Sequence, residues 1–301
     1  MTTHTATARS AVRRGLNSSI IADNYACCHS QLMRVPRATI TSITFISRQT
    51  MNDSTPLYLV NEYAPDPAVQ FDRSVGETYV RYAHMLAARG YVQSTLGGMV
   101  IRVAHPAHPD GLAYAKPAGV SLEEMALDDL VITDIPFGRV LHGNAATSVG
   151  HQMNREILRL RPDVNCVIHL HHDETIAVLA AGCEEVRSFS LTFSYLMQKP
   201  IAYLPAHLNV EEDVGPIKSF IQNTNCIVMK RHGITVLGRT VSECYHRVNV
   251  YASEVKRQII VELLCAAKGT TPEYVTKEEM EWMFKQGDGV VYPQLIRRNG
   301  G

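Results

Sequence analysis

Two histidines that alternate along one short apolar segment have the clearest chemical meaning in this sequence. Residues 166–171 read Cys-Val-Ile-His-Leu-His, and the apolar, β-branched run predicts a strand over 164–171. Because residues i and i+2 of a strand share a face, His169 and His171 project together. Two imidazoles in an apolar wall are costly unless each finds a partner, and one metal ion would satisfy both. The alternative is two separately hydrogen-bonded core histidines; His172 faces the other side.

A third histidine, His232, follows a second predicted strand over 226–230 and precedes a glycine. A histidine that leaves a buried strand at the edge of a sheet lies where sites are usually built, although a structural turn residue is the alternative. Three neutral imidazoles with an open fourth position would describe a catalytic zinc or related divalent site. Such an ion polarises a carbonyl or stabilises an enolate.

The elements around these histidines alternate between strands and helices, which is typical of the α/β class. Apolar periodicity and turn residues predict helices over 73–90, 122–127, 151–160, 173–181, 214–222 and 241–265, strands over 99–104, 111–116, 130–135, 164–171, 201–204 and 226–230, and a loop over 136–149.

The composition excludes several classes of protein. Of the 301 residues 46% are hydrophobic and 19% charged, which predicts a sizeable core rather than disorder. Lys+Arg and Asp+Glu each number 29, so the net charge is zero, and we expect neither a nucleic acid nor a membrane as partner. There is no apolar run long enough to span a bilayer. The seven scattered cysteines, without a CxxC pair, argue against a disulfide framework and for a reducing compartment.

The first fifty residues are rich in Arg, Ser and Thr and contain one acidic residue, Asp23. This is the composition of a mitochondrial transit peptide. The alternatives are a disordered tail or a start at Met51. We therefore treat 1–55 as a disordered or targeting leader outside the fold and expect a mitochondrial or a cytoplasmic location.

Residues from about 92 to 269 resemble the class II aldolase/adducin family. Residues 160–171 are similar to its most specific motif, Arg-Pro-Asp followed by a hydrophobic strand and His-x-His. Residues 230–233, Lys-Arg-His-Gly, followed by the predicted helix from Val241, are similar to its second metal motif. The two motifs together make the resemblance specific.

This resemblance implies a three-layer α/β/α sandwich around a mixed, largely antiparallel sheet. It implies that His169, His171 and His232 hold a divalent metal, with Zn²⁺ expected and Mn²⁺ or Fe²⁺ as alternatives. It also implies a homo-oligomer, with a tetramer favoured, whose active sites lie at subunit boundaries. The aldolase/adducin-like domain would cover 56–270, and 271–301 would form a tail that packs near the site.

The sequence departs from the family at the position of the general acid/base. Sugar-phosphate members carry a glutamate that works as general acid/base at the position of Gly150, and a glycine cannot move a proton. His151 is a candidate for that role, the alternative being a helix-start histidine that faces solvent or caps the helix. Tyr292 in the tail is a second candidate proton donor, the alternative being an anchor that packs.

The phosphate-binding segments also differ. Residues 97–102 resemble the family's phosphate loop, but Gly98 and Val100 replace its Asn and Ser. Gly98, Lys116 and Gly119 are the predicted substrate-binding residues, with Lys116 as a point charge toward a carboxylate or phosphate; the alternative for Lys116 is a solvated surface lysine. The loss of hydrogen-bond donors argues against a sugar-phosphate substrate.

The sequence therefore predicts a divalent-metal-dependent lyase that cleaves a C–C bond of a small carbonyl or carboxylate substrate, by an aldol step or by decarboxylation. Decarboxylation creates an enolate without first removing a proton from a hydroxyl, so it tolerates the loss of the glutamate. Gly150 and the altered phosphate loop leave a non-catalytic, adducin-like oligomerisation domain as one alternative. An iron-dependent oxygenase on the same fold is another, since imidazoles also hold iron.

Overall fold

The computed structural model describes residues 62–287, which form one eight-stranded sheet in the order β4-β3-β2-β1-β5-β8-β7-β6. Neighbouring strands are antiparallel except β6 and β7, which are parallel. The strands are β1 (Gly98–His105), β2 (His108–Ala115), β3 (Val131–Asp134), β4 (Val140–His142), β5 (Cys166–Leu170), β6 (Ala202–Leu204), β7 (Cys226–Met229) and β8 (Gly233–Gly238). The helices are α1 (Arg73–Ala88), α2 (Gly150–Leu160), α3 (Asp173–Ala180), α4 (Leu191–Met197), α5 (Val241–Lys268) and α6 (Lys277–Gly287).

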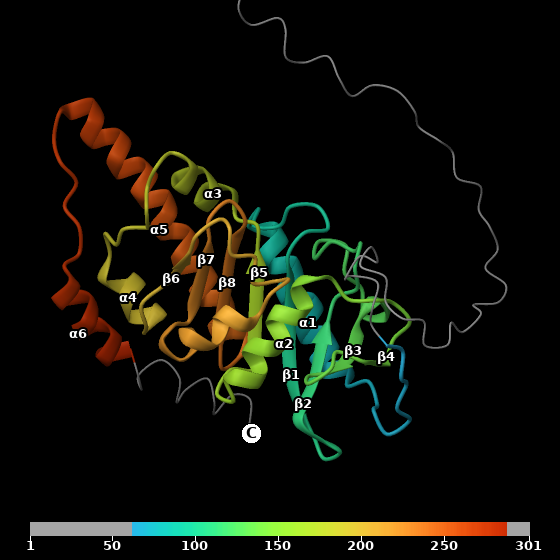
Figure 1. The fold of residues 1–301 in the computed structure, drawn as a ribbon. Helices are drawn as coiled ribbons and strands as arrows, with labels where there is room; N and C mark the ends of the chain where they lie inside the picture. Colours follow the sequence, from blue (N-terminus) through green and yellow to red (C-terminus); the bar gives the residue numbers. More distant parts are fainter. Residues whose placement is uncertain (1–61, 288–301) are drawn as a thin grey trace, which may run out of the picture. The chain divides into compact units, whose positions relative to one another are not determined.

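Helices cover both faces of the sheet, which gives the predicted three-layer α/β/α fold (Figure 1). Ile168 on the central strand β5 faces the layer made of α1, α3, α4 and α5, whereas Val167 faces α2 and the short 3-10 turns beside it. Both side chains are fully buried, so the strand is apolar on both faces. By the same alternation His169 continues the Val167 face, toward the side of α2.

Three predicted segments are wrong in detail. Residues 214–222 form two 3-10 turns, η3 (Gly215–Ser219) and η4 (Ile221–Asn223), because the backbone leaves the helical region at Phe220, where φ is −131°. Residues 122–124 form a turn rather than the start of a helix, and the 3-10 turn η2 (Leu127–Asp129) follows. The predicted loop 136–149 contains the short strand β4.

Three elements were not predicted at all. The strand β8 follows directly on the glycine turn after His232, and the helices α4 and α6 lie in segments without clear periodicity. The described part of the predicted tail is α6, which packs on α4, where Gln198 donates a hydrogen bond to the carbonyl of Gly287 (Figure 1).

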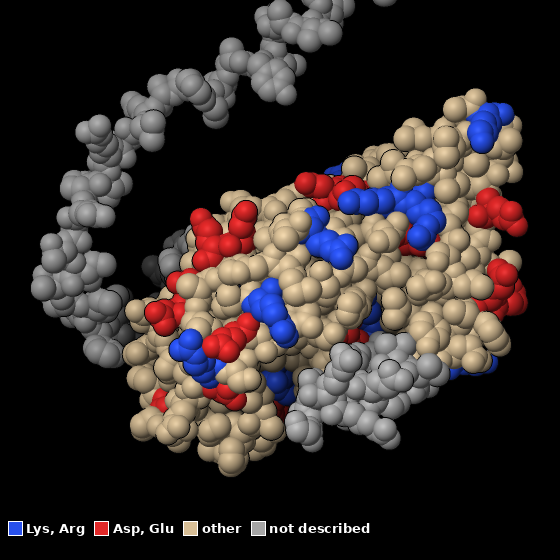
Figure 2. All heavy atoms as spheres, turned by 180° about the vertical axis from the view of Figure 1, so that it is seen from behind, with Lys and Arg blue, Asp and Glu red and all other residues tan. Residues whose placement is uncertain are grey.

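Several predictions concern residues outside the described range 62–287. They are the leader over residues 1–55, the cellular location predicted for the protein, and the role of Tyr292 as a proton donor. Within the described range, no helix combines the length and the apolar character needed to cross a membrane. On the face shown in Figure 2, acidic and basic side chains are interspersed rather than gathered into one charged field.

Candidate metal centre

Three imidazoles meet at one end of the central strands. His169 lies on β5, His171 directly after it, and His232 in the turn between β7 and β8. Their potential ligand atoms all lie within 4.8 Å of one another, and the ring centroids are 4.6–5.1 Å apart. The structure thus brings together the three histidines that the sequence singled out, while their role as ligands stays a prediction.

A glycine explains how the turn reaches the end of β5. At Gly233 a Cβ atom would overlap the carbonyl oxygen of Leu170 and would lie 3.0 Å from the Cα of His171. Only a residue without a side chain allows the β7–β8 turn to pass this close. This close approach places His232 beside His171.

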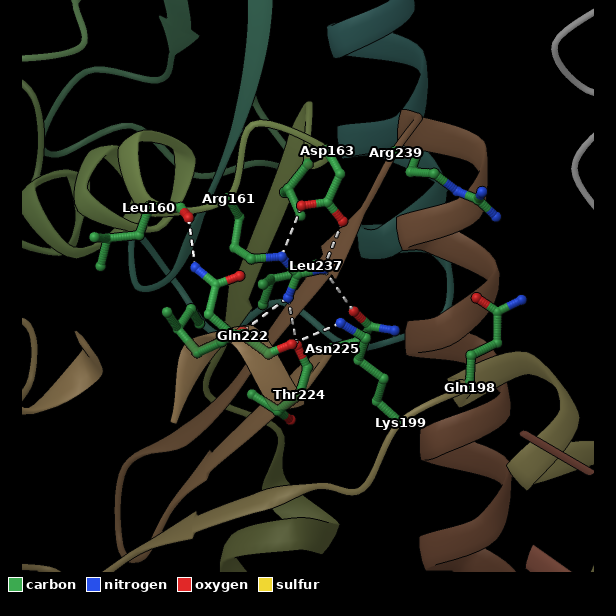
Figure 3. Close-up of polar contacts among 12 residues, drawn as sticks. Leu160, Arg161, Asp163, Gln198, Lys199, Gln222, Thr224, Asn225, Leu237 and Arg239 are labelled. Atoms are coloured by element: carbon green, nitrogen blue, oxygen red, sulfur yellow. Dashed lines mark hydrogen bonds and ion pairs between the residues drawn. The ribbon is translucent and has the colours of Figure 1, made fainter. Parts of the chain in front are cut away.

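Arg161 of the Arg-Pro-Asp motif ties the two histidine-bearing parts of the chain together (Figure 3). Its Nη1 donates hydrogen bonds of 2.8 Å to the carbonyls of Ile221 and Thr224, just before β7. Its Nε and Nη2 bind both carboxylate oxygens of Asp163, and Nη2 also reaches Oδ1 of Asn225. The guanidinium is buried, so the start of β5 and the start of β7 are held at a fixed spacing.

The donor set fits a divalent ion. Nδ1 of His169 lies 2.9 Å from Oγ1 of Thr235, and that hydroxyl has the sulfur of Met153 as its own acceptor at 3.9 Å. The hydrogen bond with Thr235 holds Nδ1, which leaves Nε2 as the nitrogen that faces the cluster. This buried Nε2 has no hydrogen-bond partner among residues 62–287. A ring whose far nitrogen is fixed by a hydrogen bond, with an orphaned lone pair at the cluster, is the arrangement of a metal-binding histidine.

The protonation states favour the same conclusion. Burial lowers the pKa of His169 to about 4. Burial, and then the neighbouring His232, also lower the pKa of His171. Both rings are therefore neutral near pH 7, which is the form that binds a metal.

The cluster opens onto a cavity of about 470 Å³. Gly98 and Gly119, two of the predicted substrate-binding residues, line it together with Asn154, His169 and His171. No Lys or Arg is among the described residues that line this cavity. Its size suits a small molecule.

Lys116 lies beneath the cavity rather than in it. Its Nζ donates hydrogen bonds to the carbonyls of Thr95 at 2.9 Å and Val120 at 2.8 Å, and burial lowers its pKa to about 8. The alternative of a solvated surface lysine is wrong, because the side chain is buried. Its predicted contact with substrate stays a prediction, and the observed bonds link the segments on two sides of the cavity.

His151 is the second residue of α2, and it is buried, so the alternative of a solvent-facing histidine is wrong. Its Nε2 lies 2.8 Å from Oγ1 of Thr133 on β3, whereas the preceding residues Ser148, Val149 and Gly150 line the cavity. Burial, and then the charge of Arg155, lower the pKa of His151 to about 3. Its predicted role in proton transfer remains untested.

We expect His151 to make the fold sensitive to acid. Because its pKa is lower in the folded chain than in the unfolded chain, the unfolded state binds the proton more tightly, and stability falls as the pH falls from about 6.5 toward 3. In this window the free energy of unfolding of the protein should fall, per pH unit, by about 1.4 kcal/mol more than that of a His151→Asn variant. Urea unfolding of both proteins at pH 7, 6 and 5 measures this, and parallel curves would contradict it.

A carboxylate that the sequence analysis missed lies at the cluster. Oε2 of Glu211 lies 3.1 Å from Nε2 of His232, and Oε1 lies 3.5 Å from Nε2 of His169. Burial alone would raise the pKa of Glu211, but the hydrogen bond with His232 and the nearby imidazoles lower it to about 2. Glu211 begins an acidic run, Glu-Glu-Asp over 211–213, that reads as a solvated surface segment, so nothing in the local sequence marks it.

Comparison with known proteins agrees with the fold and with the motifs. The model of the class II aldolase and adducin N-terminal domain matches residues 77–259. The chain is 27% identical to an L-fuculose phosphate aldolase of Methanococcus vannielii over 190 residues, which cover 61% of this chain and 94% of the relative. It is 28% identical to β-adducin of Rattus norvegicus over 169 residues, which cover 54% of this chain and 23% of that protein. The chain thus spans less than a quarter of the adducin.

Solved structures share the fold at low sequence identity. An aldolase II superfamily protein from Pseudomonas syringae has a TM-score of 0.61 at 18% identity, covering 76% of this chain and 91% of that one. An L-fuculose 1-phosphate aldolase from Glaciozyma antarctica has a TM-score of 0.58 at 18% identity, covering 71% and 81%. From the family match over 77–259 and the two histidine motifs within it, the chain belongs to the class II aldolase/adducin family.

Proposed function

We propose that this protein is a divalent-metal-dependent lyase that cleaves a C–C bond beside a carbonyl of a small carbonyl or carboxylate substrate. The observation that carries the proposal is the orphaned, buried Nε2 of His169 in a cluster with His171 and His232. An unpartnered buried polar atom costs stability, so it calls for a ligand. The similarity to a relative named L-fuculose phosphate aldolase supports the aldol type of reaction.

Zn²⁺, Mn²⁺ or Fe²⁺ bound by the three imidazoles would supply Lewis-acid stabilisation of negative charge on a substrate oxygen. The chain's own residues would position the substrate. Asn154 lines the cavity, and its buried Oδ1 has no hydrogen-bond partner within the described part of the chain, so it can accept a bond from a substrate hydroxyl. At Gly98 and Gly119 the cavity wall has no side chain, which lets a substrate lie close to the backbone at these two positions.

The charges around the cavity support a substrate without a phosphate group. The described lining contains no Lys or Arg, and the buried ammonium of Lys116 donates its hydrogen bonds to backbone carbonyls. A phosphate dianion usually needs such donors. We therefore propose a small oxo acid or hydroxy-carbonyl compound, cleaved by an aldol step or by decarboxylation.

Metal removal tests the proposed function. We expect purified protein to contain about one divalent transition-metal ion per chain, and dialysis against a chelator to abolish lyase activity on the active member of a panel of 2-oxo and 3-hydroxy acids. Adding back Zn²⁺, Mn²⁺ or Fe²⁺ should restore it. Protein that binds none of these ions would contradict the proposal.

The second candidate function is a non-catalytic, adducin-like oligomerisation domain. The similarity to β-adducin and the glycine at position 150 favour it. A protein that binds metal but is inactive on the whole panel would support this alternative over the lyase.

We also propose that the protein forms a homo-oligomer, with a tetramer favoured. Ile260, Leu263 and Leu264 are 51–66% exposed on the last turns of α5, where the i, i+3, i+4 spacing makes one apolar stripe. A second copy of the chain would cover this stripe. Static light scattering of the purified protein should give about four times the chain mass, and a monomer at micromolar concentration would contradict this.

A further inference from the structure

Glu211 is aimed at the histidine cluster from a segment far from the cluster in sequence. Val210 is fully buried among the residues that pack on α2, which fixes the segment against the domain. The backbone then turns, with the amides of Glu212 and Asp213 donating to the carbonyl of Asn209 at 3.2 and 3.0 Å. The side chain of Glu211 is only 14% exposed, unlike that of its exposed neighbour Glu212.

The space that the carboxylate occupies exists because residue 150 is a glycine. A Cβ atom at Gly150, the first residue of α2, would overlap Oε1 of Glu211. Any other residue at this position would force Oε1 to shift. The observed position of the carboxylate therefore depends on Gly150.

Glu211 and His169 lie at ion-pair distance but form no hydrogen bond. Nδ1 of His169 is bonded to Thr235, and its buried Nε2, 3.5 Å from Oε1 of Glu211, has no hydrogen-bond partner among residues 62–287. A cation between Nε2 and Oε1 would give both atoms a partner. The other carboxylate oxygen, Oε2, accepts a hydrogen bond from Nε2 of His232 at 3.1 Å, and a shared metal ion would replace this bond. Ligand atoms bound tetrahedrally to one zinc ion are separated by about 3.4 Å.

We propose that Glu211 is a fourth protein ligand, so that the resting site consists of three imidazoles and one carboxylate. This inference rests on the proposed metal-dependent function. The carboxylate would neutralise one of the two positive charges of the ion, and a bound cation would in turn give Oε1 of Glu211 and Nε2 of His169 a shared partner.

Zn²⁺ titration of the full chain tests this inference. The affinities of wild type, Glu211→Gln and the matched control Glu212→Gln are measured at pH 7 by competition with a chromophoric chelator. We expect Glu211→Gln to weaken Zn²⁺ binding by more than about 30-fold, since even residues that only support a ligand typically contribute 10–100-fold. Glu212→Gln should bind like wild type, and circular dichroism should show that all three proteins are folded.

Loading with Co²⁺ gives a readout that a merely structural role would not change. If Glu211 is a ligand, the visible absorption of the Co²⁺ form changes in Glu211→Gln and not in Glu212→Gln. Gly150→Ala should weaken Zn²⁺ binding as Glu211→Ala does, and the double variant should be no weaker than Glu211→Ala alone.

The outcomes separate the two proposals. If wild type and Glu211→Gln bind Zn²⁺ within threefold of each other, or if the Co²⁺ spectra are identical, Glu211 is not a ligand and the metal-dependent function stands. If wild type binds neither ion, the proposed function fails and the fourth ligand fails with it. Additive losses in Gly150→Ala/Glu211→Ala would overturn the dependence of the carboxylate on Gly150.

Discussion

Replacing both His169 and His171 with alanine is expected to abolish metal binding and lyase activity together. The two side chains supply two of the three imidazoles in the cluster, and the remaining His232 lies in a turn, partly exposed. One imidazole holds a divalent ion far more weakly than three, so we expect Zn²⁺ affinity to fall by at least about 1,000-fold. Metal content after gel filtration and Zn²⁺ competition at pH 7 measure this.

His246→Ala is the matched control, because His246 is exposed on α5 and lies outside the cluster. It should retain the metal and the activity of wild type. The double variant should still show the circular dichroism of a folded α/β protein, since the deleted side chains end at a cavity. A folded double variant that retains stoichiometric metal would show that the ligands are other residues.

Arg161→Ala is expected to destabilise the fold by about 3 kcal/mol. The substitution leaves the buried carbonyls of Ile221 and Thr224 without donors and Asp163 without its partner. Each buried acceptor that loses its donor costs about 1–3 kcal/mol, whereas the ion pair adds little because Asp163 is half-exposed. The loss should also weaken metal binding, because the spacing of the starts of β5 and β7 is no longer fixed.

Arg159→Ala provides the comparison, since Arg159 lies in the last turn of α2, two residues before Arg161. Arg159 pairs with Glu156 at the surface and is 41% exposed, so its removal should cost less than about 0.5 kcal/mol. Urea unfolding of the three proteins at pH 7 measures both values. Equal stabilities of Arg161→Ala and Arg159→Ala would contradict the stabilising role that we assign to the hydrogen bonds of Arg161 shown in Figure 3.

The part of the site carried by regular strands could be predicted from the sequence. The two-residue alternation of a strand places His169 and His171 on one face whatever the rest of the chain does. The grouping of His232 with them was predictable only through the motif, because the close approach at Gly233 depends on strand β8 pairing with β5. That pairing is non-local, and no local pattern indicates it.

Residues that depend on tertiary contacts were not predictable. Glu211 reads as a surface charge, and only the burial of Val210 and the vacant side-chain position at Gly150 turn it toward the cluster. The sequence around Lys116 is equally compatible with a solvated side chain, although backbone carbonyls of two segments, Thr95 and residues 117–120, accept hydrogen bonds from its ammonium. Residues 214–222 have helical periodicity, and Ile217 and Ile221 are buried as it predicts, yet the chain forms two 3-10 turns that are separated at Phe220.

The order of strands places the histidine cluster and the cavity-lining glycines on different strands of one sheet. The three clustered histidines come from β5 and the β7–β8 turn, whereas Gly98 and Gly119, which line the cavity, come from β1 and the turn after β2 on the other side of β5. Changes in the β1 and β2 segments can therefore reshape the cavity while the histidine cluster keeps its geometry. A library that varies Thr95, Leu96 and Ala118, which line the cavity, and keeps Gly97, where a Cβ would lie 2.6 Å from the carbonyl oxygen of His169, is thus a direct route to new substrate preferences on this scaffold.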